Sequence, residues 1–389
     1  MKHLKKFING PLNVMRLEGK INGIEKVIYI FMDIHLKINM QTKCSDLRSV
    51  DIVNYLVDNF DQISEKDKIY DFFFEIQSTD INTLLTKTKK KYIHEIFDLF
   101  VSSFLIDRDK NVVSKSNTFP NVRLHYIDIR DYVINYHKAL FALDGFVGKV
   151  IASGSISKDD IQEIKNLLKI NVEEVMGIHD LIYGKRPQYP DFLAKKKYFI
   201  DKIRNKYHHK NINQKINMLI DTYLIKKFND YFQYVESYYE KLDRFSKLLH
   251  VQQNDLYYDK SMRHNYGLPN YIKLDILKDV SQINEIKSSL EREIFVYLVD
   301  LFFLRRFLDK DYITNGIIYT GISHSSNYIF TLIKYFDFKI THYSYLKGTL
   351  EEFYELIKKA DDKYDVESHI YPPKLVQCSD MTSFPKLFL

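Results

Sequence analysis

Alternating apolar and polar residues near the start of the chain predict a β-hairpin. The segment LNVMRLEGK alternates, Asn22-Gly23 follows, and the apolar run KVIYIFMDIH comes after it. Asn-Gly between two such segments is a strong hairpin signal, because both residues readily take the positive φ angles of a tight turn. We expect two antiparallel strands, and the second should end near His35.

Helical and strand patterns alternate after the hairpin. Apolar residues at helical spacing predict a helix from Leu47 to Phe60 with Ser45 as its N-cap, and another from Tyr92 to Ile106. Between them, KIYDFFFEIQ predicts a buried strand that ends near Glu75. The run VRLHYIDIR, residues 122–130, predicts a third strand. This alternation is typical of a parallel sheet covered by helices.

The middle of the chain has only helical patterns, and the mixed pattern returns near its end. From about Lys158 to Leu308 the apolar residues recur at helical spacing, which predicts a helical insertion. After it come a predicted strand ending near Gly321, a helix from Ser325 to Phe336, a strand in KITHYSYL and a helix from Leu350 to Lys359. The tail from Asp361 contains three prolines and should be extended and wrap the surface.

These patterns predict an α/β fold with a mixed, mainly parallel sheet, helices on both faces, an N-terminal β-hairpin and a large all-helical insertion. The expected domains are the N-terminal half of the α/β core in residues 1–150, the helical insertion in 151–311, the C-terminal half of the core in 312–360 and the tail in 361–389.

Composition limits the function classes only mildly. The net charge of +6 is too small for 389 residues to indicate nucleic acid, and no apolar run approaches the ~20 residues of a membrane span. The start lacks the apolar core of a signal peptide, so we expect a cytoplasmic protein. Abundant Tyr and Phe with no Trp indicate an AT-rich genome, as in large DNA viruses of protists or AT-rich parasites. A viral protein would act in the host cytoplasm or the virion.

The chain has two cysteines, Cys44 and Cys378. They are too few for a disulfide framework or a four-thiolate zinc site, and we expect both to be free thiols in a reducing compartment.

Ionisable residues follow the predicted strands at their carboxyl ends. In open α/β sheets this edge collects functional groups, because the loops there leave side chains free to converge. Four strand ends carry such groups, and the candidate catalytic residues among them are His35, Glu75, His324, Asp33, Asp128 and Arg130.

Two chemistries fit these residues. His35, His324 and Glu75 form a normal ligand set for a divalent metal such as Mn, Co, Fe or Zn, which would activate a bound water. Without metal, a histidine oriented by a carboxylate could act as general base while Arg130 holds an anionic group. The sequence leaves both open.

The same residues resemble a known superfamily, which contains the Tiki and TraB proteins, the ChaN-like haem-binding proteins and the erythromycin esterases. Gly321-Ile322-Ser323-His324 is similar to its C-terminal G-x-x-H element, Met32-Asp33-Ile34-His35 to its N-terminal one, and Glu75 to the acid that ends its second strand. Met32 stands where the family has Gly, and the helical middle lies outside the resemblance. The resemblance implies a metal-dependent peptidase or esterase acting on a peptide or ester.

A basic segment in the predicted insertion supports a second hypothesis, a non-catalytic viral protein that binds protein or nucleic acid. Aromatic residues alternate with cations there, and stacking plus phosphate contacts could hold a single strand. The candidate residues are Lys195, Lys196, Lys197, Arg204 and Lys206. A solvated, lysine-rich helix face explains the same pattern. Nucleotide-binding glycine motifs, the G-x-S-x-G elbow and H-E-x-x-H are absent from the sequence. The oligomeric state is not predicted.

Overall fold

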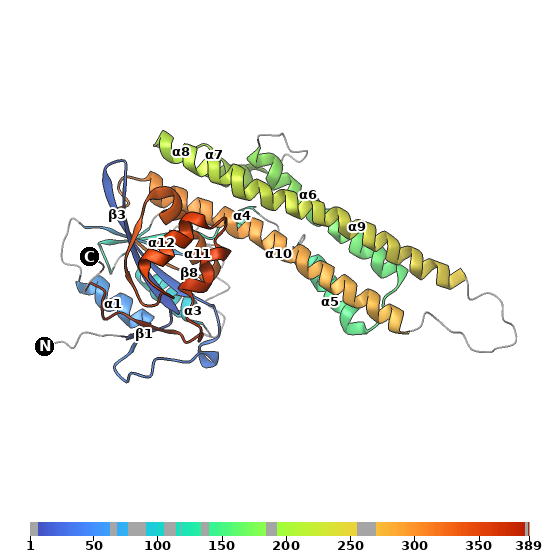
Figure 1. The fold of residues 1–389 in the computed structure, drawn as a ribbon, viewed down its shortest axis with the longest axis horizontal. Coiled ribbons are helices and arrows are strands. Elements are labelled where there is room, and N and C mark those ends of the chain that lie inside the picture. Colours follow the sequence, from blue (N-terminus) through green and yellow to red (C-terminus); the bar gives the residue numbers. More distant parts are fainter. Residues whose placement is uncertain are drawn as a thin grey trace. The chain divides into compact units, whose positions relative to one another are not determined.

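The computed structural model describes residues 7–62, 68–76, 91–104, 114–116, 118–133, 140–183, 193–254, 270–385 and 388 (Figure 1). The chain forms two compact units. The first, the sheet unit, contains Met1–Ile129, Tyr207–Ile212 and Val299–Leu389. The second, the helical unit, contains Arg130–Lys206 and Asn213–Leu298.

A sheet of seven described strands forms the centre of the sheet unit, in the order β6-β7-β5-β8-β3-β2-β9. Its strands are β2 (Asn13–Ile21), β3 (Ile24–Asp33), β5 (Tyr70–Phe74), β6 (Ser114–Lys115), β7 (Val122–Tyr126), β8 (Asn315–Gly321) and β9 (Lys339–Tyr343). The four inner strands β7, β5, β8 and β3 are parallel, and the outer strands pair antiparallel. The predicted α/β fold with a mixed sheet is therefore confirmed.

The hairpin is present as predicted. Nine residue pairs join β2 to β3, from Asn13 opposite Met32 to Ile21 opposite Ile24. The two turn residues Asn22 and Gly23 have φ angles of 50° and 86°, as a type I′ turn requires.

Strand β8 joins chain segments that lie far apart in the sequence. It pairs with β3 from Val27 opposite Asn315 to Asp33 opposite Gly321, and on its other side with β5. Strand β8 therefore lies directly beside β3, although almost 300 residues separate them in the sequence.

Helices cover both faces of this sheet. On one face, α1 (Ile52–Gln62) and α3 (Tyr92–Ser103) enclose an aromatic core that includes Phe72, Phe74 and Tyr319. On the other face, α11 (Ile322–Phe336) and the last turns of α10 (Asn270–Asp309) cover the strands, and Phe303 contacts Phe73 edge to face at 5.0 Å between ring centroids. Burial of these large rings is the main favourable term in such a core.

A second sheet of three described strands, in the order β10-β1-β4, holds the C-terminal region in place. The strands are β1 (Phe7–Asn9), β4 (Val50–Asp51) and β10 (Cys378–Asp380), and short helices α12 (Leu350–Lys359) and α13 (Tyr364–Ile370) precede β10. The prediction of an extended, surface-wrapping tail is wrong, because Phe384 and Phe388 insert into the aromatic core.

The cysteines form a disulfide, so the prediction of free thiols is wrong. Cys44 and Cys378 are joined, with their Cα atoms 5.0 Å apart. The cause is the small sheet: β10 places Cys378 opposite Asn9, and the Asn9 side-chain oxygen accepts a hydrogen bond from the Cys44 backbone N–H at 2.8 Å. Sequence spacing could not reveal this pairing across 334 residues.

Several predicted boundaries also shift. The first helix begins at Ile52 rather than Leu47, because Val50 and Asp51 pair with β1. Its predicted cap Ser45 precedes that strand. The third strand ends at Tyr126, and the chain leaves the sheet after the Ile127 N–H donates to the Phe74 carbonyl at 3.1 Å. Ile106 lies outside the described residues.

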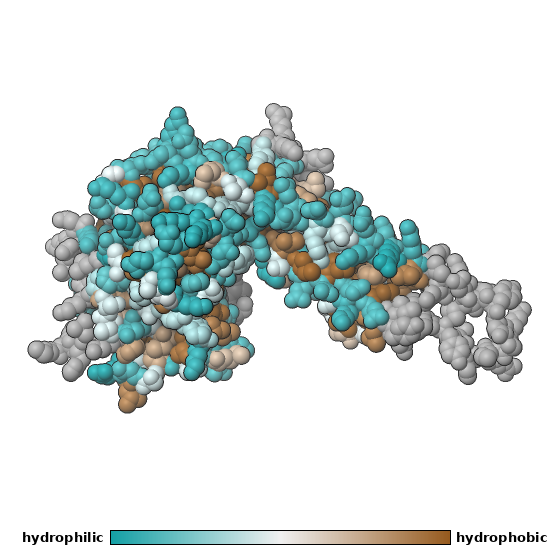
Figure 2. Space-filling view, viewed as in Figure 1, coloured by the Kyte–Doolittle hydropathy of each residue, from teal (hydrophilic) through white to brown (hydrophobic). Residues whose placement is uncertain are grey.

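In the residues that the structure describes, the helical unit consists of helices. They are α4 (Arg130–Val133), α5 (Leu140–Ser153), α6 (Lys158–Ile182), α7 (Leu193–Arg204), α8 (Lys210–Leu219), the π-helical turn η3 (Ile220–Leu224), α9 (Ile225–Asn254) and most of α10. Helix α6 begins with a capping box. The Ser157 hydroxyl accepts a hydrogen bond from the Asp160 N–H, and the Asp160 carboxylate accepts one from the Ser157 N–H. Figure 2 shows apolar areas on this unit, whose exposed apolar side chains include Ile170, Met176 and Ile286.

Candidate functional site

The carboxyl ends of three neighbouring parallel strands bring the predicted site residues together. Strand β8 lies between β3 and β5, so the groups that follow β3 and β5 flank the end of β8. His35, Glu75 and His324 consequently meet, although Glu75 and His324 are separated by almost 250 positions of sequence. This is the edge at which open α/β sheets bind ligands.

His35 bridges two carboxylates. Its Nδ1 lies 2.7 Å from Asp33 Oδ2, and its Nε2 lies 3.5 Å from Glu75 Oε2. The residue has φ = 53°, a left-handed conformation that side chains other than Gly rarely adopt and that often marks functional sites. The His35 side chain is 30% exposed, whereas Asp33 is fully buried. His35 is thus the member of the pair that solvent reaches.

Glu75 is fixed by donors from the end of β8. Its Oε2 accepts hydrogen bonds from the Thr320 hydroxyl at 2.7 Å and from the Gly321 N–H at 2.6 Å. A Cβ atom on Gly321 would lie 3.1 Å from His35 Nε2 and 3.3 Å from Glu75 Oε2. The glycine therefore leaves the room in which the imidazole and the carboxylate approach each other.

His324 makes the equivalent contacts on the buried side of Glu75. It lies in the first turn of α11, with its Nε2 3.1 Å from Glu75 Oε1 and its Nδ1 2.5 Å from Asp300 Oδ1. Asp300, in α10, also accepts a hydrogen bond from the Asn327 side chain at 2.6 Å. Asp33, His35, Glu75, His324 and Asp300 thus form one continuous array, which we call the carboxylate–histidine chain.

The charges of the carboxylate–histidine chain depend on one another. Burial alone would lower the pKa of both imidazoles, but the hydrogen bonds of His35 with Asp33 and Glu75 raise its pKa to about 10. The charges of Glu75 and Asp300 raise the pKa of His324 to about 9. Burial alone would raise the pKa of Glu75, but the charge of His324 outweighs it and keeps that pKa well below its usual value.

The site brings the carboxylates of Asp33, Glu75 and Asp300 together, and their negative charges require positive charge nearby. If both imidazoles were neutral, three negative charges would be buried together, at a prohibitive desolvation cost. Two imidazolium protons reduce the formal charge to −1. Both histidines are therefore protonated at neutral pH in the arrangement that the structure shows.

The residues predicted as metal ligands contact one another directly. Both Nε2 atoms face Glu75 oxygens, and Glu75 Oε2 already accepts two hydrogen bonds. In the described part of the chain no group of three or more His, Cys, Asp or Glu side chains is arranged to hold a metal ion. The donor set does not fit a metal as it lies, so the metal stays a prediction from sequence.

The other two candidate catalytic residues are less directly placed. Asp128 is 3% exposed and follows β7, where its charge acts on the buried hydroxyl of Tyr328, a neighbour of His324. Arg130 is the first residue of α4 and belongs to the helical unit. The prediction that Arg130 ends the third strand is wrong, because β7 stops at Tyr126.

The predicted nucleic-acid segment lies on α7 and just after it. Some of its cations form ion pairs or hydrogen bonds with other residues of the helical unit. Lys196 is 4% exposed and forms an ion pair with Glu174 of α6. Arg204 bonds to Asn217 at 2.8 Å and to Asp221 at 3.1 Å. Lys197 and Lys206 are exposed. The Lys195 side chain lies outside the described residues.

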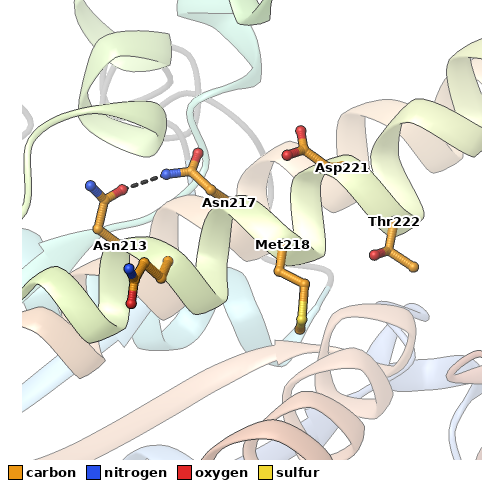
Figure 3. A pocket seen from close by; sticks show the side chains of 6 residues that line it. Asn213, Asn217, Met218, Asp221 and Thr222 are labelled. Carbon is orange, nitrogen blue, oxygen red and sulfur yellow. Dashed lines mark hydrogen bonds between the residues drawn. The ribbon is translucent and has the colours of Figure 1, made fainter.

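A shallow hollow of about 510 Å³ lies on α8 and η3 in the helical unit (Figure 3). Its lining is rich in amides and consists of Asn213, Gln214, Asn217, Met218, Asp221 and Thr222. In Figure 3 Asn213, Asn217 and Asp221 project to one side of the helix and Met218 and Thr222 to another, and the Asn217 side chain donates a hydrogen bond to that of Asn213. The hollow contains none of the predicted catalytic residues.

A second buried polar cluster lies on the face of the sheet that α10 covers. His125 Nε2 lies 2.6 Å from Asp71 Oδ1, and its Nδ1 accepts a hydrogen bond from Arg306 Nε at 2.9 Å. Arg123 donates to the other Asp71 oxygen at 2.6 Å. Burial lowers the pKa of His125 to about 4, so this histidine is neutral. Both ring nitrogens of His125 have partners, which indicates a structural role.

Sequence reasoning missed two residues of the site. Asp300 interrupts the apolar helical run VYLVDLFFL, and an acid there needs a buried partner. That signal was available. Gln377, whose Nε2 donates to Asp33 Oδ1 at 3.1 Å, follows a proline-containing tail and carried no comparable signal.

Known proteins similar to this chain come from a giant virus. Acanthamoeba polyphaga mimivirus encodes "Uncharacterized protein R706", 35% identical over 98% of this chain and 97% of its own length, and "Uncharacterized protein R161", 32% identical over 98% of both chains. "Uncharacterized protein R160" of the same virus is 30% identical over the whole of this chain and 98% of its own. No solved structure matches the chain. These relatives agree with one of the two sources that the composition indicated, a large DNA virus of protists.

In the described part of the chain, none of the helices is both long and apolar enough to traverse a membrane.

The resemblance to the Tiki/TraB, ChaN-like and erythromycin-esterase superfamily is wrong. The family model that covers almost all of the sequence is a different one, and the mimivirus relatives match over the helical middle as well as both ends. Short G-x-x-H elements at strand ends arise in unrelated sheets, because any parallel sheet collects polar groups at that edge. The matching model is described as "Family of unknown function (DUF5847)" and spans residues 6–389, so the chain belongs to this family.

Proposed function

We propose that this protein is a hydrolase-like enzyme whose reaction centre is the carboxylate–histidine chain. The observation that carries the proposal is His35: a 30% exposed imidazole, held in a left-handed conformation, with one nitrogen on buried Asp33 and the other facing buried Glu75. A histidine oriented by a carboxylate and open to solvent is the usual proton-transfer group of hydrolytic enzymes.

The geometry supports a division of roles. Asp33 occupies Nδ1 of His35, so proton exchange with a substrate falls to Nε2, which lies 3.5 Å from Glu75 Oε2. One proton shared between these atoms could be delivered to the leaving oxygen of an ester or the leaving nitrogen of a peptide. The Glu75 carboxylate could then take a proton from the attacking water. His324 lies on the buried side and keeps Glu75 in its ionised form, while Asp300 contacts the other ring nitrogen of His324.

The test is hydrolysis by the purified full chain of a chromogenic acetate ester and of a fluorogenic peptide mixture. His35→Asn should reduce the rate by about 10²–10⁴-fold, the usual contribution of a proton-transfer group. Asparagine also tolerates the left-handed conformation, so the fold should survive. His342→Asn, on β9 in the same sheet, is the matched control and should keep the rate. Equal rates for both variants would refute the proposal.

Metal dependence is decided in the same experiment. Elemental analysis for Mn, Fe, Co and Zn accompanies each preparation, and rates are compared with and without a chelator. Metal near one equivalent per chain that disappears in a His324→Asn variant would support the metal prediction from sequence. A chelator-resistant rate in metal-free protein would assign the reaction to the side chains alone.

The mimivirus relatives favour the host cytoplasm or the virion as the place of action. The Cys44–Cys378 disulfide favours a compartment or particle in which disulfides persist.

A further inference from the structure

The Cys44–Cys378 disulfide joins two segments that meet beside the site. Cys44 lies in the loop that leaves the site after His35, and Cys378 begins β10. Neighbouring backbone bonds hold the same segments: Gln377 N–H donates to the Thr42 carbonyl at 3.1 Å, and Gly10 N–H donates to the Gln377 carbonyl at 3.2 Å. We call the disulfide with these bonds the clasp.

The residue next to the disulfide contacts the site itself. The Gln377 side chain is fully buried, and its Nε2 donates to Asp33 Oδ1 at 3.1 Å. The other Asp33 oxygen holds His35 Nδ1 at 2.7 Å. Gln377 therefore fixes the rotation of the Asp33 carboxylate, and that carboxylate fixes the His35 ring. Two hydrogen bonds therefore connect Gln377, the residue next to Cys378, to the His35 imidazole.

Both cysteines of the disulfide are partly exposed to solvent, whereas the hydrogen bond between Gln377 and Asp33 is buried. Cys44 and Cys378 are both partly exposed, and Gln377 and Ser379 on either side of Cys378 are fully buried. A small thiol can therefore attack the sulfur atoms without unfolding the sheet unit. Strand β10 pairs with β1 over three residue pairs, and the Ser379 hydroxyl also donates to the Pro11 carbonyl at 3.0 Å.

We propose that Gln377 is a positioning residue for Asp33 and His35, and that the Cys44–Cys378 disulfide is the redox switch that keeps it in place. Reduction by a dithiol breaks the S–S bond and forms two cysteine thiols, while the dithiol gives up two electrons and two protons and closes to its own disulfide. The tail then loosens, Gln377 leaves Asp33, and the His35 ring loses its fixed orientation. The effect on catalysis rests on the proposed function.

The test compares the full chain before and after treatment with dithiothreitol. Thiol titration should rise from zero to two per chain. Amide hydrogen exchange of Gly10, Cys44 and Gln377 should accelerate, while exchange in β5 and β8 stays unchanged. The ring resonances of His35 should shift on reduction, and ester hydrolysis should fall by at least tenfold and return on reoxidation.

Two variants separate positioning from stability. Gln377→Met keeps the size of the side chain but removes its donor, and should shift the His35 resonances and lower kcat in oxidised protein without making the amides of the clasp exchange faster. Gln62→Met, at an exposed position of α1, should change neither. The double variant Cys44→Ser/Cys378→Ser should reproduce the reduced state and ignore dithiothreitol.

The outcomes are distinct. Unchanged exchange and unchanged His35 resonances on reduction would overturn the switch, whatever the activity. Shifted resonances in reduced protein, with no hydrolysis in either state, would support the clasp and refute the hydrolase proposal instead. A normal His35 spectrum in Gln377→Met would overturn the positioning role.

Discussion

Replacing Glu75 by Gln tests the charge balance of the site most directly. Gln has the same shape, so its carbonyl oxygen can still accept from Thr320 and Gly321 at the Oε2 position. Its amide group then points at His324 Nε2, where a carboxylate oxygen lay at 3.1 Å. A protonated His324 would face another donor there. The variant therefore forces His324 to lose its proton or leaves Asp300 alone to balance its charge.

The size of the effect follows from the burial of the pair. Glu75 and His324 expose only 6% and 5% of their side chains, and breaking a buried ion pair by removing one partner costs about 3–5 kcal/mol. Loss of the His324 proton offsets part of this cost, because a neutral imidazole accepts the Gln amide. We expect the full 3–5 kcal/mol only at a pH where His is protonated in the unfolded chain as well.

The pH dependence has a definite sign. In the folded protein the pKa of His324 is raised to about 9, above its ordinary 6.5. Its proton therefore stabilises the fold fully below pH 6.5, and this stabilisation is lost as the pH rises through about 9. Glu75→Gln removes the larger cause of the raised pKa, the charge of Glu75, and leaves only the contribution of Asp300. The stability difference between wild type and variant should be largest at pH 6 and shrink by pH 9.5.

The measurement is amide hydrogen exchange of β5 and β8 with chelator present, because these strands report on the sheet unit alone. Glu355→Gln, at a largely exposed carboxylate of α12, is the control and should change stability by less than about 0.5 kcal/mol. A difference below about 1 kcal/mol at pH 6, or one equal at both pH values, would refute the charge balance described above.

Two further substitutions probe the remaining geometry. Lys196→Ala should destabilise the helical unit by about 3–5 kcal/mol because it removes the buried cation that pairs with Glu174, whereas Lys197→Ala on the exposed side should stay within about 0.5 kcal/mol. Equal urea midpoints would contradict the burial of Lys196. Gly321→Ala places a Cβ 3.1 Å from His35 Nε2, so hydrolysis should fall at least about tenfold with a small change in melting temperature. A fully active Gly321→Ala would show that the imidazole and carboxylate need no such close approach.

Local patterns predicted most of the sheet. Alternation around Asn22-Gly23 gave the hairpin, and the apolar runs ending at Glu75 and Gly321 gave two inner strands. The rule that parallel strands end at one edge then sufficed to expect His35, Glu75 and His324 near one another, as the distances show. No detail of side-chain packing entered that expectation.

Contacts between distant segments were not predictable in the same way. Gln377 and Cys378 reach the site only because β10 pairs with β1, a match of three residues that no periodicity reveals. The burial of Lys196 was readable in principle, since Phe199, Ile200 and Ile203 lie three, four and seven positions later on one helical face. Because Lys196 stands between two other lysines, the sequence did not indicate that it faces inward.

The central place of β8 has a consequence for synthesis. Residues 315–321 leave the ribosome long after the hairpin and β5, yet they lie between them in the finished sheet. Until then β3 and β5 each present an unpaired edge, and the phenylalanine-rich β5 lacks a neighbour on one side. Nascent chains with such edges associate readily with one another. We therefore expect a higher yield of folded recombinant protein when translation is slow at low temperature and chaperones are abundant.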